Sequence, residues 1–524
     1  MTSSHDWPSA RSRLGAESSP AQPQAASGNG SKTFHEVVGC QSLCARRQSP
    51  WRWCWSFARL STPLVALVSL SVLLASCDAG IGQGSGVAVC SPLSFGAVAD
   101  GKTDNTIAIQ RAVDECAAQG GGITVLSTAG KDAVYVTGPF TLKSHVHLYI
   151  DKGVTLRATN EHSRYVAAYI NWIYRPNEAL ISANGATDVA IIGGGTIDGA
   201  SDEPDPEDGD RTWYEVAAAE SAANPSTRPW VLEFYQCDHV LISGVTLQNQ
   251  PYWTQALRFS RDITEVGVTI NGIGRNSDGV DLVGVTDVVL SDLDIRDSDD
   301  YIAVKSGLPI SPSDPYYSRE IGLPQMPTSR VRISNITATD GQGISIGSEA
   351  VNGVHDVVIR NVNLSNSRGG FRIKTGRDRG GEIYDIRVDH FVMNGGDWPL
   401  IIDSFYSTVG PDPNGPAQPI TATTPHVHDI YIQDLVATST GGQSYIHGLP
   451  ESCINNVVLN DVSIQTTGPG IDLLHMTGTF TDVTSAPPQP DPPFVVEENV
   501  TVTTAGTTPS IPRTPPLADQ LPCS

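Results

Sequence analysis

The chain has 524 residues, enough for a large buried core, and a formal net charge of -23. Such an excess of acid excludes an extended nucleic-acid surface, because phosphate binding requires clustered Lys and Arg. Aromatic residues make up only 7% and charged residues 17%, while Gly (50) and Pro (36) are abundant, which is typical of a turn-rich, all-β protein.

The N-terminal part has the pattern of an export signal. Four arginines between residues 46 and 59 precede PLVALVSLSVLLAS, an apolar run that is short for a membrane span. The run ends in Leu74-Ala75-Ser76-Cys77, which resembles the lipobox of bacterial lipoproteins. We expect residues 1–77 to be an extension with a lipoprotein-type signal. The protein is then exported and either anchored through a lipid on Cys77 at the bacterial cell surface or periplasm, or secreted after cleavage nearby.

After a cap, one phrase recurs along the chain: a polar residue, a short apolar run, a polar turn and a second apolar run. Examples are DVVLSDLDIRDS from Asp287 and DVVIRNVNLSNS from Asp356. The first apolar residues of the phrases are Val240, Val266, Val288, Val331, Val357, Ile386, Ile430 and Val457. Most steps are 22 to 29 residues, and the two longer ones contain Pro-rich stretches that we interpret as loops inserted into a rung. The spacing predicts a right-handed parallel β-helix.

The two ends of the coil need covers. Before the repeats, TDNTIAIQRAVDECAAQGGG predicts an N-terminal capping helix with Asp104 or Asn105 at its start. After them, APPQPDPPF begins a Pro-rich stretch that is not expected to add rungs. We therefore expect a β-helix domain over residues 90–480 and a Pro-rich C-terminal tail over 484–524.

Beyond Cys77 the chain has five cysteines, an odd number that cannot pair fully within an exported chain. Cys90 and Cys116 both lie in the predicted cap, so a bridge between them is the favoured pair. The other three are Cys237, Cys453 and Cys523, and their spacings fit no zinc site.

Carboxylates gather at one place, in NSDGVD from Asn276 and SDDYIAVKSG from Ser298. Asp278 and Asp299 are 21 residues apart, close to one turn of the predicted coil, so they should lie one above the other. Two carboxylates at such short range do not ionise alike, which makes one an acid and the other a base. The aspartates that begin other repeats, such as Asp188, are interpreted as turn residues.

These residues resemble glycoside hydrolase family 28, the polygalacturonase family. Its pattern of N-T-D, G-D-D, G-H-G and R-I-K is similar to Asn276-Ser277-Asp278, Ser298-Asp299-Asp300, Gly341-Gln342-Gly343 and Arg372-Ile373-Lys374. The resemblance begins near Phe95 and continues to the last rungs.

The resemblance implies that Asp299 is the general acid of an inverting hydrolysis, with Asp278 and Asp300 positioning and deprotonating the water. Gln342, Arg372, Lys374 and Asn276 are the expected substrate-binding residues. Arg372 and Lys374 share one face of a strand while Ile373 points inward, which forms a cationic clamp for a galacturonate carboxylate.

Two features complicate this assignment. Alternation counted back from Ile302 puts Asp300 inside the coil and Asp299 outside it, so both acidic motifs must lie on a bend before a strand if their aspartates face one groove. Gln342 also stands where the family has a histidine; Gln can donate a hydrogen bond to a carboxylate but does not titrate.

The predicted function is therefore an exported glycoside hydrolase that cleaves α-galacturonosidic bonds in pectin, acting as a monomer without cofactor or metal. Three alternatives stay open: a hydrolase of rhamnogalacturonan, a calcium-dependent polysaccharide lyase on the same fold, and a non-catalytic surface glycan-binding protein. For the lyase, the acidic stretch SDEPDPEDGD, residues 201–210, is the candidate calcium loop. The predicted partner in the first case is an acidic polysaccharide, with no nucleic acid and no membrane contact apart from a lipid on Cys77.

Overall fold

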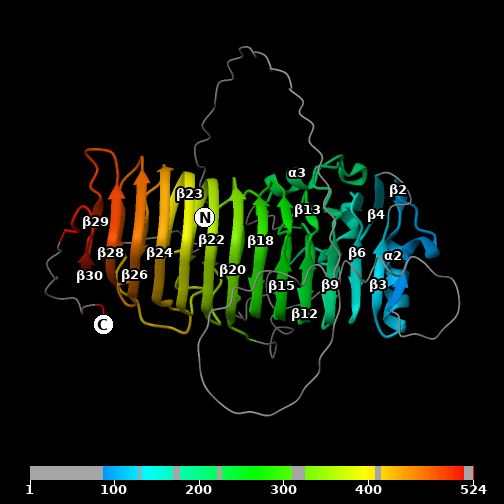
Figure 1. The fold of residues 1–524 in the computed structure, drawn as a ribbon, viewed down its shortest axis with the longest axis horizontal. Helices are drawn as coiled ribbons and strands as arrows, with labels where there is room; N and C mark the ends of the chain where they lie inside the picture. Colours follow the sequence, from blue (N-terminus) through cyan, green and yellow to red (C-terminus); the bar gives the residue numbers. More distant parts are fainter. Residues whose placement is uncertain are drawn as a thin grey trace, which may run out of the picture. The chain divides into compact units, whose positions relative to one another are not determined.

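The structure, a computed structural model, describes residues 87–127, 132–168, 177–220, 227–309, 325–406, 415–512 and 523. These residues form a right-handed parallel β-helix, which confirms the predicted fold class (Figure 1). The predicted signal with Cys77 lies outside the described residues. Within the part of the chain that is described, no helix is both long and apolar enough to span a membrane.

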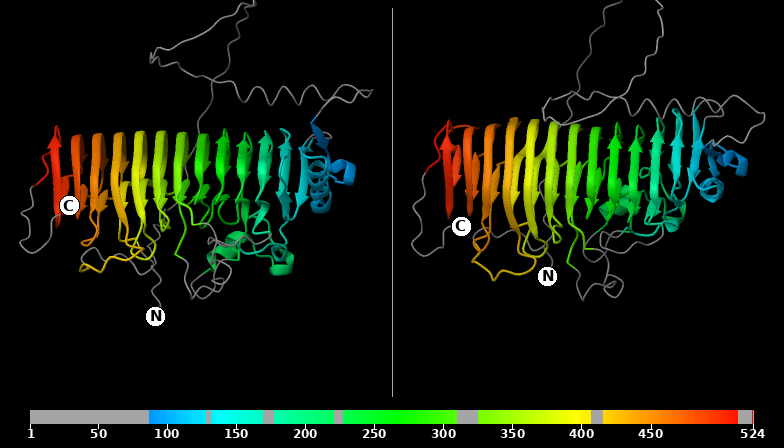
Figure 2. Two further views of the ribbon diagram at one scale, coloured as in Figure 1. Left: turned by 90° about the horizontal axis from the view of Figure 1, so that it is seen from below. Right: turned by 60° about the horizontal axis from the view of Figure 1, so that its bottom comes forward.

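Each turn of the coil runs through three parallel sheets, which stack rung upon rung in Figure 2. The first sheet is the longest. Its strands are β1 (Ala88–Cys90), β3 (Gly122–Leu126), β6 (Val146–Ile150), β9 (Thr187–Gly193), β12 (Asp238–Ser243), β15 (Arg261–Val266), β18 (Thr286–Arg296), β20 (Thr328–Thr339), β22 (Val354–Lys374), β23 (Glu382–Asp403), β24 (His426–Thr440), β26 (Ile454–Thr466), β28 (Met476–Ala486) and β30 (Val500–Ala505).

The second sheet has short strands of its own only in the N-terminal half, because the long strands from β18 onward bend through both sheets. Its separate strands are β2 (Asp100–Asp104), β4 (Ala133–Thr137), β7 (Val154–Ala158), β10 (Thr196–Asp198), β13 (Thr246–Gln248) and β16 (Thr269–Asn271).

The third sheet carries the acidic motifs, and we call it the site sheet. It contains the C-terminal ends of β22 and β23 together with β5 (Phe140–Leu142), β8 (Ala179–Asn184), β11 (Trp230–Tyr235), β14 (Gln255–Arg258), β17 (Val280–Val283), β19 (Ile302–Lys305), β21 (Ile344–Gly347), β25 (Tyr445–His447), β27 (Ile471–Leu474) and β29 (Phe494–Val496).

Alternation along the strands builds the core, since every second side chain points into the coil. In β18, Val288 and Leu290 are fully buried, and the register sets them beside Val331 and Ile333 of the next rung. Burying a side chain of this size contributes about 1.5 to 3 kcal/mol. Repetition of such pairs over many rungs stabilises a coil in which each rung contacts only its neighbours.

Left-handed kinks where the repeats begin explain their polar first residues. Asp188, Asp356, Asp385 and Asp429 all have φ between 51° and 56°, in the left-handed region. Asp enters this region more readily than most residues because its short side chain can hydrogen-bond locally. These aspartates lie within the first residues of β9, β22, β23 and β24, so each marks a left-handed kink at the start of a strand and not the turn between strands that the sequence had suggested.

The cap agrees with the sequence. The helix α2 (Thr106–Ala118) begins after Asn105, and the Asp104 carboxylate accepts a hydrogen bond of 2.9 Å from the backbone N–H of Thr106. The predicted disulfide joins Cys90 to Cys116. The other helices are α3 (Trp213–Ala218) and the 3₁₀ turns Pro92–Phe95, His162–Arg164 and Pro206–Asp208.

The register differs from the prediction in one rung. Val266 was expected to begin a repeat, but Ile263 is the residue that pairs with Val240 on one side and Val288 on the other. The phrase starts at Asp262, whose φ is 54°, and its first apolar residue, Ile263, lies three residues before Val266. The two long steps are confirmed as insertions, because β18 pairs directly with β20 and β23 with β24.

The C-terminal segment was expected to add no rung, and this is wrong. Strands β29 and β30 pair in parallel with β27 and β28, so the coil continues past residue 480 to Ala505. A disulfide between Cys453 and Cys523 ties the end of the chain to the body. Prolines 487 to 493 occupy the turn between β28 and β29, where no ladder hydrogen bond from their nitrogens is needed.

Candidate active site

The four motifs meet on the outer face of the site sheet. Asp278 precedes β17, Asp299 and Asp300 precede β19, and Gln342 precedes β21. The register aligns these strands with the end of β22, which carries the clamp residues. The residues before β17 and β19 form bends rather than extended strand, as the alternation of side chains requires.

The three aspartates form one compact group, which we call the acidic centre. One carboxylate oxygen each of Asp278, Asp299 and Asp300 lies within 4.8 Å of the other two. Asp278 and Asp300 are 4% and 2% exposed. This arrangement brings together the predicted catalytic residues in a place where charge repulsion is weakly screened.

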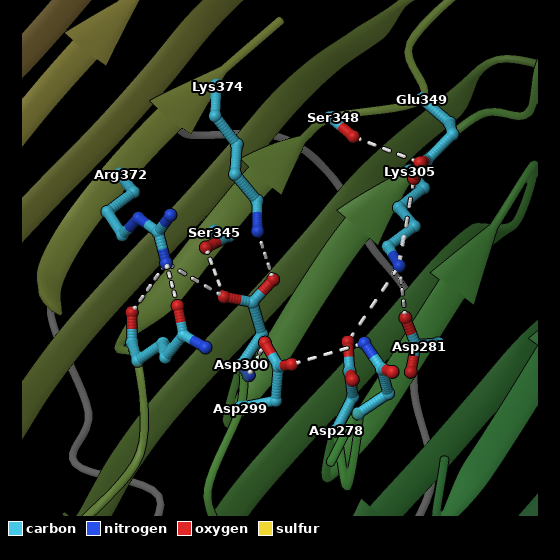
Figure 3. Close-up of polar contacts among 12 residues, drawn as sticks. Asp278, Asp281, Asp299, Asp300, Lys305, Ser345, Ser348, Glu349, Arg372 and Lys374 are labelled. Atoms are coloured by element: carbon cyan, nitrogen blue, oxygen red, sulfur yellow. Dashed lines mark hydrogen bonds and ion pairs between the residues drawn. The ribbon is translucent and has the colours of Figure 1, made fainter. Parts of the chain in front are cut away.

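Asp300 is the member of the centre that is held as an anion. Lys374 Nζ donates to its Oδ2 at 2.5 Å, Arg372 Nη1 to its Oδ1 at 3.2 Å and Ser345 Oγ to Oδ1 at 2.8 Å, as Figure 3 shows. Burial by itself would raise the pKa of Asp300. The charges of Lys374 and Arg372 outweigh burial, so this pKa lies below its usual value.

Asp278 and Asp299 are shifted in the other direction. Burial, and then the charges of Asp281 and Asp299, raise the pKa of Asp278 well above its usual value. Burial followed by the charge of Asp300 raises the pKa of Asp299. Asn276 Nδ2 lies 3.4 Å from Asp299 Oδ2 and is positioned to donate to it. The centre thus combines one fixed anion with two carboxyl groups that favour protonation.

Lys305 organises the other side of the centre, and its role was not anticipated. Its Nζ lies 2.7 Å from Asp281 Oδ1, 3.8 Å from Asp278 Oδ2 and 3.7 Å from Glu349 Oε2. The ammonium also lies 4.0 Å from the centre of the Trp253 ring, a favourable cation–π distance. A signal was present in the sequence: Lys305 and Asp281 each lie on the outward face of a strand that directly follows an acidic motif.

Two more buried carboxyl groups surround the centre. Burial raises the pKa of Asp281 to about 7 although Lys305 opposes the shift. Asp297 is fully buried two residues before Asp299, and burial and the charge of Asp299 raise its pKa well above the usual value. The charges of Asp281 and Asp297 add to the repulsion among the carboxylates of the site, which favours the protonated forms.

The side chain of Gln342 contacts Arg372 and not a carboxylate of the acidic centre. Its side-chain Oε1 lies 3.4 Å from Arg372 Nη1, and its backbone carbonyl accepts from the same nitrogen at 3.1 Å. Its backbone N–H donates to the carbonyl of Asp299 at 2.6 Å. Gln342 therefore reaches the acidic centre through Arg372 and the backbone, because the turn before β21 aims its side chain toward β22.

The clamp residues occupy the predicted face of β22, with Phe371 and Ile373 fully buried on the other face. Their side chains are only 12% exposed for Arg372 and 10% for Lys374. Their contacts with Asp300 neutralise part of the charge of the centre. An anion arriving in the groove would meet these cations beside Asp300.

The chemistry of the acidic centre also bears on a metal. Among the described residues, Asp278, Asp299 and Asp300 are the sole group of three or more ligand side chains close enough to share an ion. Lys374 and Arg372 already compensate Asp300. In the candidate calcium loop, Asp205 accepts hydrogen bonds from the backbone N–H groups of His162 and Glu207. Asp208 contacts His162 and Arg211, so both carboxylates already have partners within the protein.

Comparison with known proteins agrees with this geometry. The model of glycosyl hydrolases family 28 matches residues 122–483, which include every residue of the site. A "Probable polygalacturonase" of Vitis vinifera is 30% identical over 389 residues, covering 71% of this chain and 74% of the relative. An "Endo-polygalacturonase" of Pectobacterium carotovorum subsp. carotovorum is 28% identical over 355 residues, covering 66% and 82%.

Solved structures share the fold. The exopolygalacturonase of Thermotoga maritima superimposes with a TM-score of 0.59 at 22% identity and covers 84% of this chain and 96% of its own. The polygalacturonase of Erwinia carotovora ssp. carotovora gives a TM-score of 0.55 at 22% identity, with 82% and 100% covered. At this identity the similarity shows the β-helix alone.

Proposed function

The chain belongs to glycosyl hydrolases family 28 and is a glycoside hydrolase, and we propose that it cleaves α-galacturonosidic bonds in pectic polysaccharides. The observation that carries this proposal is the acidic centre beside a pair of cations on one strand face. Carboxylates supply the proton transfers of glycoside hydrolysis, and the cations recognise an acidic sugar. The names of the relatives, polygalacturonases, support the same substrate class.

Asp299 is the proposed general acid. Its raised pKa keeps a proton available, and Asn276 holds the carboxyl in place. In the reaction, Asp299 transfers this proton to the leaving glycosidic oxygen as the bond to the anomeric carbon breaks. The leaving sugar departs as a neutral alcohol, and Asp299 is left ionised.

Asp278 and Asp300 are the proposed water-activating pair. Asp300 is ionised because of Lys374 and Arg372, and it can accept a hydrogen bond from a water that Asp278 also contacts. Asp278 acts as the base in its ionised form, and its raised pKa makes this carboxylate a stronger base than Asp300. The reactive state of the centre therefore carries one proton, on Asp299. As the water attacks the anomeric carbon, its proton passes to this pair, so the site regains the proton that Asp299 gave away.

The stereochemistry follows from which group attacks. Pairs of carboxyl groups are about 5–5.5 Å apart in retaining glycosidases and about 6.5–9.5 Å apart in inverting ones. The oxygens of the acidic centre lie within 4.8 Å, near the shorter range. We nevertheless assign inversion, because two carboxylates are available to hold a water while a third acts as the acid.

The test uses defined oligogalacturonates with the purified protein. Proton NMR of the first product resolves its anomeric configuration, and β-configured reducing ends from the α-linked substrate are expected. Retention of configuration would overturn the assigned roles. An unsaturated product that absorbs ultraviolet light would identify a lyase, and binding without new reducing ends would identify a glycan-binding protein.

Export is a second part of the proposal. The described residues carry two disulfides, Cys90–Cys116 and Cys453–Cys523, which persist in an oxidising compartment. We propose that Cys77 is acylated and holds the protein at a membrane. A Cys77→Ala variant should then appear in the soluble fraction while the parent stays with membranes, and equal solubility of both would contradict the anchor.

A further inference from the structure

The outer face of the site sheet continues beyond the clamp on the side toward the C-terminus. The register of the site sheet aligns Lys374 with Asp403 and then with His447. It aligns Arg372 with Ile401 and then with Tyr445. Successive rungs are about 4.8 Å apart, so these side chains lie one and two rungs from the clamp.

The charge of this stretch is opposite to that of the clamp. The outward positions next in line are Ile401, Asp403, Tyr445, His447, Asp472 and Leu474, which include two carboxylates and neither Lys nor Arg. Burial raises the pKa of Asp403 to about 6, so its carboxylate is charged at neutral pH. Negative charge continues into the following rung, since Asp472 adds to the effect of burial in raising the pKa of Glu497.

The same stretch offers groups that suit an uncharged sugar. The rings of Tyr445 and His447 lie 4.7 Å apart between centres, at 39° to each other. His447 Nε2 lies 3.3 Å from Asp472 Oδ2, and the two side chains are 15% and 13% exposed.

These groups match the two ways in which proteins hold neutral sugars. An aromatic ring covers the apolar face of a pyranose, and carboxylates accept hydrogen bonds from its hydroxyls. A second uronate carboxylate would instead face Asp403 and Asp472. The charge of Arg372 reaches Asp403, but this guanidinium is already paired with Asp300, so it offsets only part of the repulsion.

We propose that Asp403, Tyr445, His447 and Asp472 form a subsite for an uncharged sugar, adjoining the acidic sugar that the clamp holds. This neutral subsite rests on the proposed function and refines its substrate: a pectic chain in which a galacturonate is followed by an uncharged unit. Such a unit is either a neutral sugar or a methyl-esterified galacturonate, because both lack the negative charge that Asp403 and Asp472 would repel.

The first experiment uses the parent protein and needs no variant. Hydrolysis is measured at neutral pH on oligomers of equal length that are fully ionised, partly methyl-esterified so that charged and esterified galacturonates adjoin, or alternating between galacturonate and a neutral sugar. We expect kcat/KM to be higher by about five- to tenfold on one or both uncharged-unit chains than on the ionised one. The better of the two chains identifies the source of the uncharged unit.

Variants then test whether Asp403 and Asp472 cause the preference for uncharged units. Asp472→Asn and Asp403→Asn should each lower KM for the fully ionised oligomer severalfold and leave kcat unchanged, because each removes one repelling charge. The matched control is Asp434→Asn, at a left-handed position within β24 of the first sheet where Asp434 contacts His390. It should leave every parameter unchanged. Thermal melting checks that each variant is folded.

The outcomes separate this inference from the function on which it rests. Equal or better turnover of the fully ionised oligomer by the parent, with KM insensitive to Asp472→Asn, would overturn the neutral subsite and leave the hydrolase intact. Absence of hydrolysis on all three oligomers would overturn the proposed function itself. If a variant fails to fold, the parent's preference among the oligomers decides alone.

Discussion

Asp278 and Asp299 lie just before strands of the site sheet, whereas Asp188 and Asp429 lie at left-handed kinks near the start of β9 and β24 in the first sheet. Burial and neighbouring carboxylates raise the pKa of the first two. At Asp188, burial is outweighed by contacts with His147 and His145, and the pKa falls.

Asp429 is lowered by hydrogen bonds from Asn456 and then His428. One residue type at similar places in a repeat therefore has two opposite acid strengths. The difference comes from what the neighbouring rung presents to each carboxyl group, a carboxylate in the acidic centre and a donor at the kinks.

The largest expected effect is on turnover. Asp299→Asn should lower kcat by roughly a hundred- to ten-thousandfold, because Asn cannot protonate the leaving oxygen. The matched kink variant, Asp385→Asn, removes a carboxylate that contacts Arg387 on the surface and should keep parental turnover. Initial rates on oligogalacturonates measure both. Parental activity of Asp299→Asn would contradict its assignment as the acid.

Substitutions at different members of the acidic centre should change the free energy of unfolding in different directions. Asp300→Asn leaves Lys374 and Arg372 without their buried anion and should lower the free energy of unfolding by about 3 kcal/mol at pH 7. Because the pKa of Asp300 is lowered, this contribution exists above the unfolded value of about 3.9 and is lost as pH falls through the folded value.

Asp278→Asn should change the free energy of unfolding in the opposite direction, by raising it. A raised pKa means that the parent loses stability as pH rises from about 3.9 through the folded value, so Asn should stabilise the fold by about 1 kcal/mol at neutral pH and have no effect at low pH. Urea unfolding at both pH values measures these differences. Equal shifts for the Asp278 and Asp300 variants would show that the centre is not divided as proposed.

A smaller effect is expected from Gln342→His, which places a titrating ring beside Arg372. The profile of kcat/KM against pH should gain an ionisation near about 6.5. A protonated imidazole adds positive charge near the acidic centre, which favours ionised Asp299 and should weaken activity on the acid side. Superimposable profiles for parent and variant would mean that position 342 does not communicate with the carboxylates.

The smallest effect belongs to the surface kinks. Asp188→Asn should lower the free energy of unfolding by less than about 0.5 kcal/mol, because its contacts with His145 and His147 are largely exposed to solvent. Because the pKa of Asp188 is lowered, the loss should be present above about pH 4 and disappear as pH falls through the folded value, and 1 M salt should remove it. A large, salt-independent loss would show that the kinks resemble the acidic centre.

The sequence alone predicted the elements that depend on local periodicity and on a few motifs. The recurring apolar runs predicted the parallel β-helix, and TDNTIAIQRAV predicted the cap helix. The order of four motifs predicted which residues meet beside Asp299, because adjacent repeats in a coil become adjacent rungs. The acidic pattern and the strand parity together also predicted the bends that carry the acidic motifs.

The tertiary structure decided the contacts that link distant positions. Ile263 rather than Val266 occupies the paired position, because a register is chosen by the rungs on both sides. The partners of Lys305, the turn of Gln342 toward Arg372 and the attachment of β29 depend on side chains and strands far apart in the chain. The burial and the charge at such contacts come from side chains on several rungs, so they cannot be read from any single repeat of the sequence.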